Sequence, residues 1–185
     1  MQEYIHIDIY KDENCFFRSV SVYLSDTQEN YSIIREMISQ YADANREQFK
    51  EFFINDNVDE VLCSLELNTY IDNIKRDGEY AGIIELSIAS KIFGFNVYVY
   101  IEYINNDEYY ELYEKIDNEN QNIPICNLLY ENGNHFSILI KKSDHKEKRA
   151  INTITDIKNN LNREKIKITK NMIAKKMYMI SINIL

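Results

Sequence analysis

The sequence predicts an α+β fold in which helices come first and strands follow. Helical spacing of apolar residues dominates from residue 15 to residue 93, and high β propensity dominates from residue 95 to residue 140, an order unlike a repeated βαβ pattern. The 185 residues are 45% hydrophobic and 28% charged, which is enough to bury one core. We therefore expect one folded body over residues 1–141 and an extension over residues 142–185.

The body begins with a predicted strand, a turn and a helix. Polar and apolar residues alternate from Tyr4 to Tyr10, which is typical of a half-buried strand. A polar turn over residues 11–14 follows. The next helix begins at Cys15, and its apolar face is expected to anchor it in the core.

Further helical patterns occupy the middle of the chain, and they are residues 33–41, 47–54, 58–65, 67–74 and 83–93. We expect Asn30 or Ser32 to cap the first of these helices and Gly94 to end the last. Residues 76–82 contain two glycines and predict a loop before the apolar, central helix 83–93. Glu85 in that helix is expected to cap it or to pair with Arg18.

The strand predictions follow residue 94, and they are residues 95–104, 108–113, 125–129 and 135–140. Residues 97–101 form a run too continuously apolar and aromatic for a strand with one face in water. The Asn132-Gly133 pair favours a tight turn between the last two strands.

Charge divides the chain into an acidic and a basic part. Residues 141–185 contain 12 Lys/Arg and 4 Asp/Glu, a net charge of +8, whereas residues 1–140 carry −17. An acidic body repels nucleic acid and suits a basic protein partner. Residues 146–167 and 168–180 predict helices in the basic extension, to which we assign no chemical role.

Other classes of protein are disfavoured. No apolar run approaches the roughly 20 residues of a membrane span, and the N-terminus does not resemble a signal peptide, so we expect a soluble, intracellular protein. Three widely spaced cysteines favour reduced thiols over a disulfide framework. Cys63 and Cys126 are expected in the core, and His6 and His145 at the surface. No phosphate, dinucleotide or zinc motif occurs, so no cofactor or metal is expected.

Cys15 and His135 are candidate catalytic residues. Unpaired N–H groups and the helix dipole favour a thiolate at the start of a helix, so we expect the pKa of Cys15 to lie below its ordinary value of about 8.5. His135 begins a strand 120 residues later. Thiolate attack on a carbonyl needs an imidazole within hydrogen-bond reach, which distant segments usually supply. Taken alone, such a pair is more often structural than catalytic.

Three segments together resemble the motifs of the OTU (ovarian-tumour-type) cysteine deubiquitinases. The family's Asp-Gly-Asn-Cys-Leu-Phe-Arg motif is similar to Asp12-Glu13-Asn14-Cys15-Phe16-Phe17-Arg18. Its Trp-Gly-Gly loop, followed by Glu-Leu on a helix, is similar to Tyr80-Ala81-Gly82-Ile83-Ile84-Glu85-Leu86. Its histidine followed by an aromatic residue is similar to His135-Phe136. The resemblance covers roughly residues 4–141 and none of the extension.

The resemblance implies a papain-type cysteine protease fold with a central, mostly antiparallel sheet packed between helices. It implies that Cys15 is the nucleophile and His135 its general base. It also implies that the turn ending at Cys15 donates N–H groups to an oxyanion, with Asp12 holding that turn in shape. The expected activity is hydrolysis of ubiquitin or ubiquitin-like conjugates through a thiol acyl-enzyme, with no cofactor. A basic face such as ubiquitin offers suits the acidic body.

Two departures from the family pattern bear on activity. Glu13 replaces a glycine, so the backbone conformation at this position must be one that a residue with a side chain can adopt. Ser137 stands where the family commonly carries Asn or Asp to orient the histidine, and it shares a strand face with His135 but has no charge. Three possibilities remain for the group that orients His135. The site is a Cys/His dyad with or without help from Ser137, or Asp8 from the first strand takes this role, or another group does.

Other functions remain compatible with the sequence. The departures at Glu13 and Ser137 suit a ubiquitin-binding, OTU-like module with weak or no catalysis. A papain-like peptidase with another substrate would use the same Cys15 chemistry. A structural domain with a chance Cys/His pair is the remaining alternative.

Overall fold

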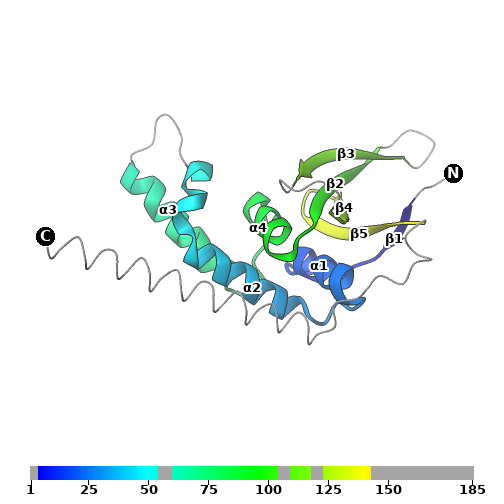
Figure 1. The fold of residues 1–185 in the computed structure, drawn as a ribbon, viewed down its shortest axis with the longest axis horizontal. Coiled ribbons are helices and arrows are strands. Elements are labelled where there is room, and N and C mark those ends of the chain that lie inside the picture. Colours follow the sequence, from blue (N-terminus) through cyan, green and yellow to red (C-terminus); the bar gives the residue numbers. More distant parts are fainter. Residues whose placement is uncertain (1–3, 54–59, 104–108, 118–122, 143–185) are drawn as a thin grey trace, which may run out of the picture. The chain divides into compact units, whose positions relative to one another are not determined.

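The structure is a computed structural model that describes residues 4–53, 60–103, 109–117 and 123–142 (Figure 1). Its elements in chain order are β1 (Tyr4–Ile7), α1 (Cys15–Ser25), α2 (Tyr31–Ala44), the 3₁₀ helix η1 (Arg46–Phe53), α3 (Glu60–Ile74), α4 (Ile83–Phe93), β2 (Asn96–Tyr103), β3 (Tyr109–Ile116), β4 (Ile125–Glu131) and β5 (His135–Lys141). The predicted α+β class is confirmed. The helices predicted at 146–167 and 168–180 lie outside the described residues.

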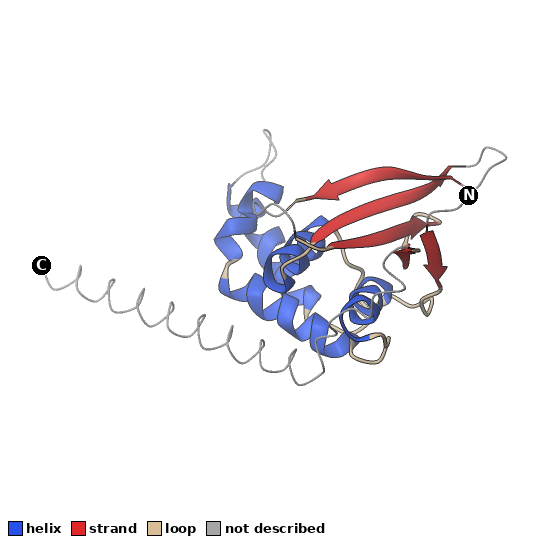
Figure 2. Ribbon diagram, turned by 45° about the vertical axis from the view of Figure 1, so that its right-hand side comes forward, coloured by secondary structure: helices blue, strands red, loops and turns tan. Residues whose placement is uncertain are grey.

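Five strands form one sheet in the order β1-β5-β4-β2-β3 (Figure 2). Only β2 and β4 pair in parallel among the described strands, so the sheet is mostly antiparallel, as expected. The β4–β5 turn has positive φ at Asn132 (53°) and Gly133 (76°), which confirms the Asn-Gly prediction. β1 pairs with β5, with Tyr4 opposite Lys141, so the first and last strands of the body lie side by side.

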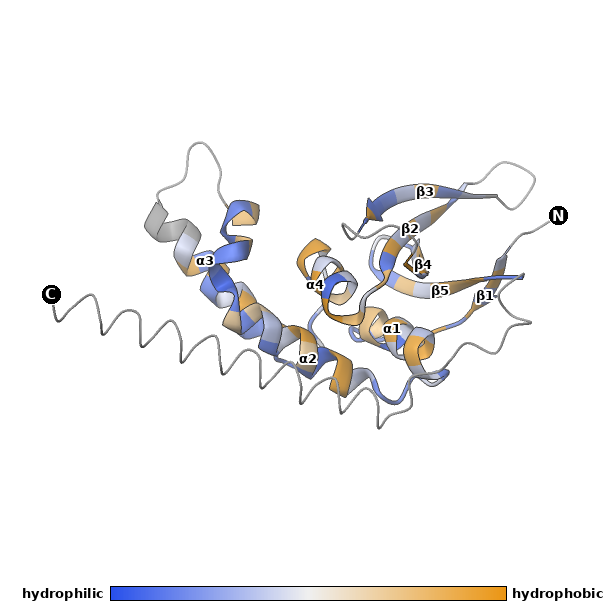
Figure 3. Ribbon diagram, viewed as in Figure 1, coloured by the Kyte–Doolittle hydropathy of each residue, from blue (hydrophilic) through white to orange (hydrophobic). Residues whose placement is uncertain are grey.

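Helices α1 and α4 bury their apolar residues against this sheet, α1 on β4 and β5 and α4 on β2 and β3. Figure 3 shows that hydrophobic positions are concentrated on these helices and on the central strands, while β3 is mostly polar. The largest fully buried side chains include Phe16, Phe17, Phe95, Ile88 and Leu128. This core fixes the start of α1 relative to the start of β5, where the candidate catalytic residues lie.

The first strand is shorter than predicted. It ends at Ile7 instead of Tyr10, because the Gln28 side chain replaces a neighbouring strand as hydrogen-bond partner. Gln28 Oε1 accepts from the Tyr10 N–H at 2.9 Å, and its Nε2 donates to the Asp8 carbonyl at 3.2 Å. The chain therefore leaves the sheet before the turn that precedes Cys15.

The two short helices predicted at 58–65 and 67–74 are one helix, α3. The prediction was wrong because no proline or glycine interrupts residues 60–74, and Leu67, Ile71 and Ile74 form one buried stripe. Cys63 lies in α3, but its side chain is outside the described residues. Cys126 is fully buried, as expected.

The start of α4 is held by a buried carboxylate. Glu85 Oε2 accepts hydrogen bonds from the Gly82 N–H at 2.7 Å and from the Tyr70 hydroxyl at 2.8 Å. Burial raises the pKa of Glu85 despite these donors. Glu85 thus has the predicted capping role, whereas Arg18 pairs with Asp12 instead. Gly94 ends α4 in the left-handed conformation, with φ of 72°.

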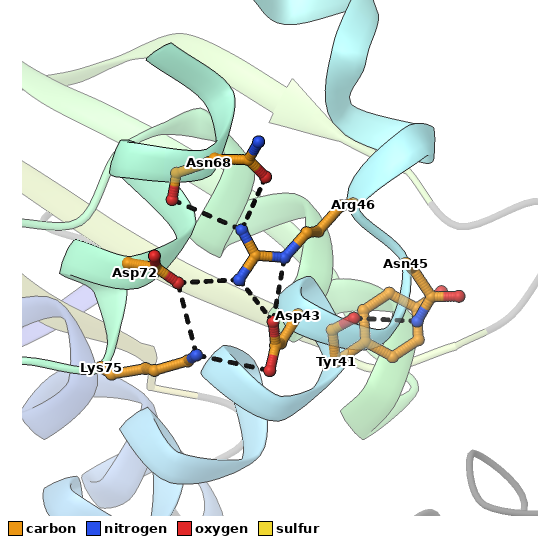
Figure 4. Close-up of polar contacts among 7 residues, drawn as sticks. All are labelled: Tyr41, Asp43, Asn45, Arg46, Asn68, Asp72 and Lys75. Atoms are coloured by element: carbon orange, nitrogen blue, oxygen red, sulfur yellow. Dashed lines mark hydrogen bonds and ion pairs between the residues drawn. The ribbon is translucent and has the colours of Figure 1, made fainter. Parts of the chain in front are cut away.

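A surface cluster connects the end of α2 to α3 (Figure 4). The Arg46 guanidinium donates to Asp43, Asp72 and Asn68, and Lys75 lies between the same two carboxylates. Exposed pairs of this kind contribute about 0–1 kcal/mol each. Among the described residues, no helix is long and apolar enough to cross a membrane.

Candidate active site

The Cys15 side chain is buried at the N-terminus of α1, directly beside the first residues of β5. Its exposed fraction is 2%. The Cys15 Sγ accepts a hydrogen bond from the Phe136 N–H at 3.3 Å and contacts the Asn134 carbonyl oxygen at 3.8 Å. Because these two residues flank His135, the structure brings the predicted cysteine and histidine segments together across 120 residues.

Asp12 makes two side-chain contacts in and next to the turn before Cys15. Its Oδ1 accepts from the Asn14 N–H at 3.0 Å, and its Oδ2 pairs with Arg18 at 2.8 Å. Partial burial opposes ionisation of Asp12, but the Arg18 guanidinium holds its pKa below the ordinary value. Arg18 is itself fixed by stacking over the Tyr31 ring, 4.0 Å from its centroid.

Replacing Asp12 with alanine is expected to loosen this turn. The change removes an N–H acceptor and the charge partner of Arg18, and hydrogen bonds to charged groups contribute about 1.5–3 kcal/mol each. We expect a lower free energy of unfolding and slower alkylation of Cys15. Urea denaturation and iodoacetamide labelling measure both effects. The neighbouring, exposed Glu13 is the control: Glu13→Gln should leave the free energy of unfolding unchanged, and an equal loss would contradict the assignment to Asp12.

The backbone at Glu13 does not require a glycine. The non-glycine residues with positive φ in the described part of the chain are Asp26 and Asn132. The backbone at Glu13 therefore has a negative φ, which any residue with a side chain can adopt. The change from glycine to glutamate does not prevent this turn from forming.

The N–H groups of the turn are largely occupied. Those of Asp12, Asn14 and Cys15 donate to Tyr10 O, Asp12 Oδ1 and Asp12 O, respectively. Between Asp12 and Cys15, the Glu13 N–H is the one for which the structure gives no acceptor. A second donor for an oxyanion requires the Cys15 N–H to leave Asp12 O, from which it lies 3.1 Å away.

The expectation of a lowered pKa for Cys15 was wrong. Burial raises the pKa of the thiol above its ordinary value, although the N–H groups of Phe136 and Phe16 act in the opposite direction. The sequence pattern shows the N–H groups at a helix start but not how deeply the sulfur is covered. In this structure Cys15 is a thiol at neutral pH, and it needs a base to become a nucleophile.

Alkylation of Cys15 should therefore rise steeply with pH. Only the thiolate reacts, and a raised pKa keeps the thiolate a minor species until the pH exceeds the ordinary value. We expect the iodoacetamide rate to increase about tenfold per pH unit from pH 6 to pH 8.5, because the thiolate fraction does so below the pKa. Intact mass spectrometry at several pH values measures it. A rate already constant at pH 7 would contradict a raised pKa.

His135 is 7% exposed and begins β5. Burial lowers its pKa, and the charges of Glu131 and Asp12 partly offset this, whereas Lys11 and His6 add to it. The imidazole is therefore neutral at pH 7, which is the form that accepts a proton.

Ser137 and Asp8, the candidates for the group that orients His135, differ in their surroundings. Ser137 is fully buried, and its hydroxyl donates to Glu131 Oε2 at 2.6 Å. Asp8 lies 3.9 Å from His6 Nε2, but its side chain is 97% exposed. His6 was expected at the surface, yet its side chain is only 27% exposed and hydrogen-bonds Ser137. Glu131 and His6 were both missed. The sequence predicts that the preceding strand ends at residue 129, whereas β4 continues to Glu131, which pairs with His135.

Asn14 is a further residue that the sequence left unassigned. Its Oδ1 accepts from Arg35 Nη2 at 2.7 Å and from the Gly78 N–H at 3.4 Å. Arg35 also donates to the Ile74 and Glu79 carbonyl oxygens, at 3.0 and 2.7 Å. This buried guanidinium joins the residue before Cys15 to the loop after α3.

A groove of about 310 Å³ includes Phe136, the residue whose N–H donates to the Cys15 sulfur. It is lined by Ala81, Gly82, Ile83, Leu86, Val99, Tyr113, Glu114, Tyr130 and Phe136. The second motif of the sequence analysis therefore forms one wall of this groove. No group of three or more metal-ligating side chains occurs among the described residues.

The fold and the site together have the arrangement found in papain-type cysteine proteases, in which a helix begins at the thiol and a strand begins at the histidine. The OTU-like cysteine protease family matches residues 11–136, and the chain belongs to this family. The match spans both Cys15 and His135.

Individual relatives agree with this assignment. The chain is 30% identical over 143 residues to OVARIAN TUMOR DOMAIN-containing deubiquitinating enzyme 7 of Arabidopsis thaliana, covering 75% of this chain and 33% of the relative. It thus spans about a third of that relative's length. The OTU domain of OTUD1 superposes with a TM-score of 0.60 at 18% identity, covering 75% of this chain and 86% of that domain. The Hazara virus OTU bound to ubiquitin superposes with a TM-score of 0.55 at 17% identity, covering 75% and 81%.

Proposed function

We propose that this chain hydrolyses ubiquitin or ubiquitin-like conjugates through a thiol acyl-enzyme, with Cys15 as nucleophile, His135 as general base and Asp12 as the residue that shapes the turn. The observation that carries the proposal is the Cys15 sulfur held between backbone atoms of the two residues that flank His135. The names of the curated relatives and the ubiquitin-bound viral structure support the choice of substrate.

The first half of the reaction transfers a proton and forms a thioester. Neutral His135 takes the proton of the Cys15 thiol as the sulfur attacks the isopeptide carbonyl carbon. Negative charge develops on the carbonyl oxygen, and we assign the Glu13 N–H as a donor to it. The C–N bond then breaks, the imidazolium gives its proton to the leaving lysine amine, and the modifier remains bound to the sulfur as a thioester.

The second half of the reaction releases the modifier. Neutral His135 takes a proton from a water molecule as the water oxygen attacks the thioester carbonyl. The C–S bond breaks, and the sulfur recovers its proton from the imidazolium. The modifier leaves with a free carboxyl end. A preorganised oxyanion donor contributes about 3 kcal/mol in such reactions, which is why the turn held by Asp12 matters.

Substrate recognition is proposed to combine a groove with charge. The groove beside Phe136 has apolar and aromatic walls suited to an extended peptide tail. The acidic body, with its net charge of −17 over residues 1–140, suits the basic face of ubiquitin. Since such conjugates occur inside cells, we propose an intracellular site of action, which includes a host cytoplasm if the source is a pathogen, symbiont or virus.

Covalent capture tests the proposed function. Ubiquitin with a C-terminal propargylamide should add once to the wild-type protein, as measured by intact mass. Cys15→Ala should abolish the adduct, and Cys126→Ala, a thiol buried in β4, should retain it. Folded wild-type protein that forms no adduct with ubiquitin or other modifiers would contradict the proposal. Noncovalent binding without an adduct would instead favour a binding module.

A further inference from the structure

The carboxylate of Glu131 lies opposite the candidate base. Glu131 is the last residue of β4 and His135 the first of β5, and the two are directly paired in the antiparallel register. Side chains paired in this way project from the same face of a sheet at close distance. Sequence comparison by motif alone would not find this residue, because it belongs to the other strand.

Two further side chains hold this carboxylate in place. The Ser137 hydroxyl donates its single proton to Glu131 Oε2 at 2.6 Å. The Ser137 oxygen also lies 2.7 Å from His6 Nε2, so this nitrogen must carry the proton that they share. His6 Nε2 is also 3.6 Å from Glu131 Oε2. Ser137 therefore orients this carboxylate oxygen directly, and His6 fixes the Ser137 hydroxyl.

Burial separates Glu131 from the alternative acid, Asp8. The Glu131 side chain is 20% exposed and rests on a fully buried Ser137, whereas the Asp8 side chain is 97% exposed. A charge shielded from water acts more strongly on its neighbours than one surrounded by it. Of these two carboxylates, Glu131 is thus the one able to influence an imidazolium at His135.

We propose that Glu131 is the positioning residue of this site, stabilising the imidazolium that His135 becomes, with Ser137 and His6 fixing the carboxylate. This inference rests on the proposed function. It assigns Ser137 a role different from that of an orienting residue in direct contact with the histidine: the serine orients the carboxylate.

The charged groups around His135 are consistent with this role. The carboxylates of Glu131 and Asp12 favour the imidazolium, while Lys11 and His6 oppose it. Asp12 is already paired with Arg18, which reduces the field that it exerts. Among the described residues, no lysine or arginine forms an ion pair with Glu131, so its charge remains available to a developing positive charge.

The pKa of His135 provides a test that needs no substrate. The protein has three histidines, so NMR of histidine-labelled protein can follow each ring, with His135→Ala identifying the signal. Glu131→Gln keeps an acceptor for Ser137 and removes only the charge. We expect it to lower the pKa of His135 measurably, whereas the control Glu111→Gln, an exposed carboxylate on β3, should not. No change in Glu131→Gln would overturn the proposal.

Kinetics test the same residue in turnover. Glu131→Gln should lower kcat about tenfold, the factor that corresponds to one pKa unit, with KM changed less than kcat. Glu131→Asp should recover part of the loss, and Asp8→Asn should lower kcat far less than Glu131→Gln. Equal losses in Asp8→Asn and Glu131→Gln would overturn the assignment. A loss confined to KM would point to substrate contact instead.

Substitutions at Ser137 distinguish two arrangements: in one, residue 137 orients the Glu131 carboxylate, and in the other it orients His135 directly. Asparagine can donate to Glu131, whereas aspartate would place a second carboxylate beside it and raise the pKa of one of the two. We expect Ser137→Asn to retain more activity than Ser137→Asp, and the reverse order would contradict the proposal. If neither ubiquitin nor another modifier captures the wild-type protein, the proposed function fails, yet the His135 titration still decides whether Glu131 acts on His135.

Discussion

Replacing His135 with alanine is expected to lower kcat/KM for a ubiquitin substrate by about 10²–10⁴-fold, the usual contribution of a general base. The effect should be large because burial raises the pKa of the Cys15 thiol, so the enzyme cannot rely on a preformed thiolate. Hydrolysis of a fluorogenic ubiquitin C-terminal amide measures the loss. A loss of less than tenfold would indicate that another group deprotonates Cys15.

Two controls separate chemistry from folding in this variant. The thermal midpoint should change little, because no side-chain hydrogen bond of His135 occurs among the described residues. Added imidazole should restore part of the activity by replacing the missing base. For the wild type, burial lowers the pKa of His135, so activity should persist below pH 6.5 and decline only as the pH falls through that lowered pKa.

The largest effect on stability is expected from Arg35→Met. The guanidinium is 4% exposed and donates to Asn14, Ile74 and Glu79, with its carbon 3.8 Å from the centre of the Phe17 ring. Its loss leaves the Ile74 and Glu79 carbonyl oxygens without this donor, and Asn14 Oδ1 keeps only the Gly78 N–H at 3.4 Å. Each buried acceptor that loses its hydrogen bond costs about 1–3 kcal/mol. Urea denaturation measures the free energy of unfolding.

Arg46→Met is the matched control for Arg35→Met. Arg46 has as many polar partners, but it lies in the surface cluster of Figure 4 and its side chain is 26% exposed. Water can replace those partners, so the loss should be about 1 kcal/mol or less. Equal losses for the two variants would show that the number of contacts, and not their burial, determines stability here.

Periodicity and turn chemistry predicted most of the elements. Alternation located β1, helical spacing located α1, α2 and α4, and the Asn132-Gly133 pair located the β4–β5 turn. These features depend on neighbours within a few residues, which a sequence displays directly. The motifs at residues 12–18, 80–86 and 135–136 then predicted the family, because all three occur in the right order.

The remaining features depend on contacts between distant segments. The early end of β1 depends on hydrogen bonds with Gln28. The parallel pairing of β2 with β4 depends on the order of all five strands in the sheet. The pKa of Cys15 depends on how deeply the sulfur is buried against β5. The contacts of Glu131 and Arg35 combine residues from several elements, and no local pattern marks them.

The pairing of β1 with β5 also affects how the protein is made. Tyr4 is opposite Lys141, so the edge of the sheet forms only after almost the entire body has been synthesised. Contacts between residues so far apart in sequence slow folding, because a long loop must close first. A nascent chain still attached to the ribosome therefore holds Cys15 without the strand that covers it. The proposed activity therefore requires that the last strand has emerged.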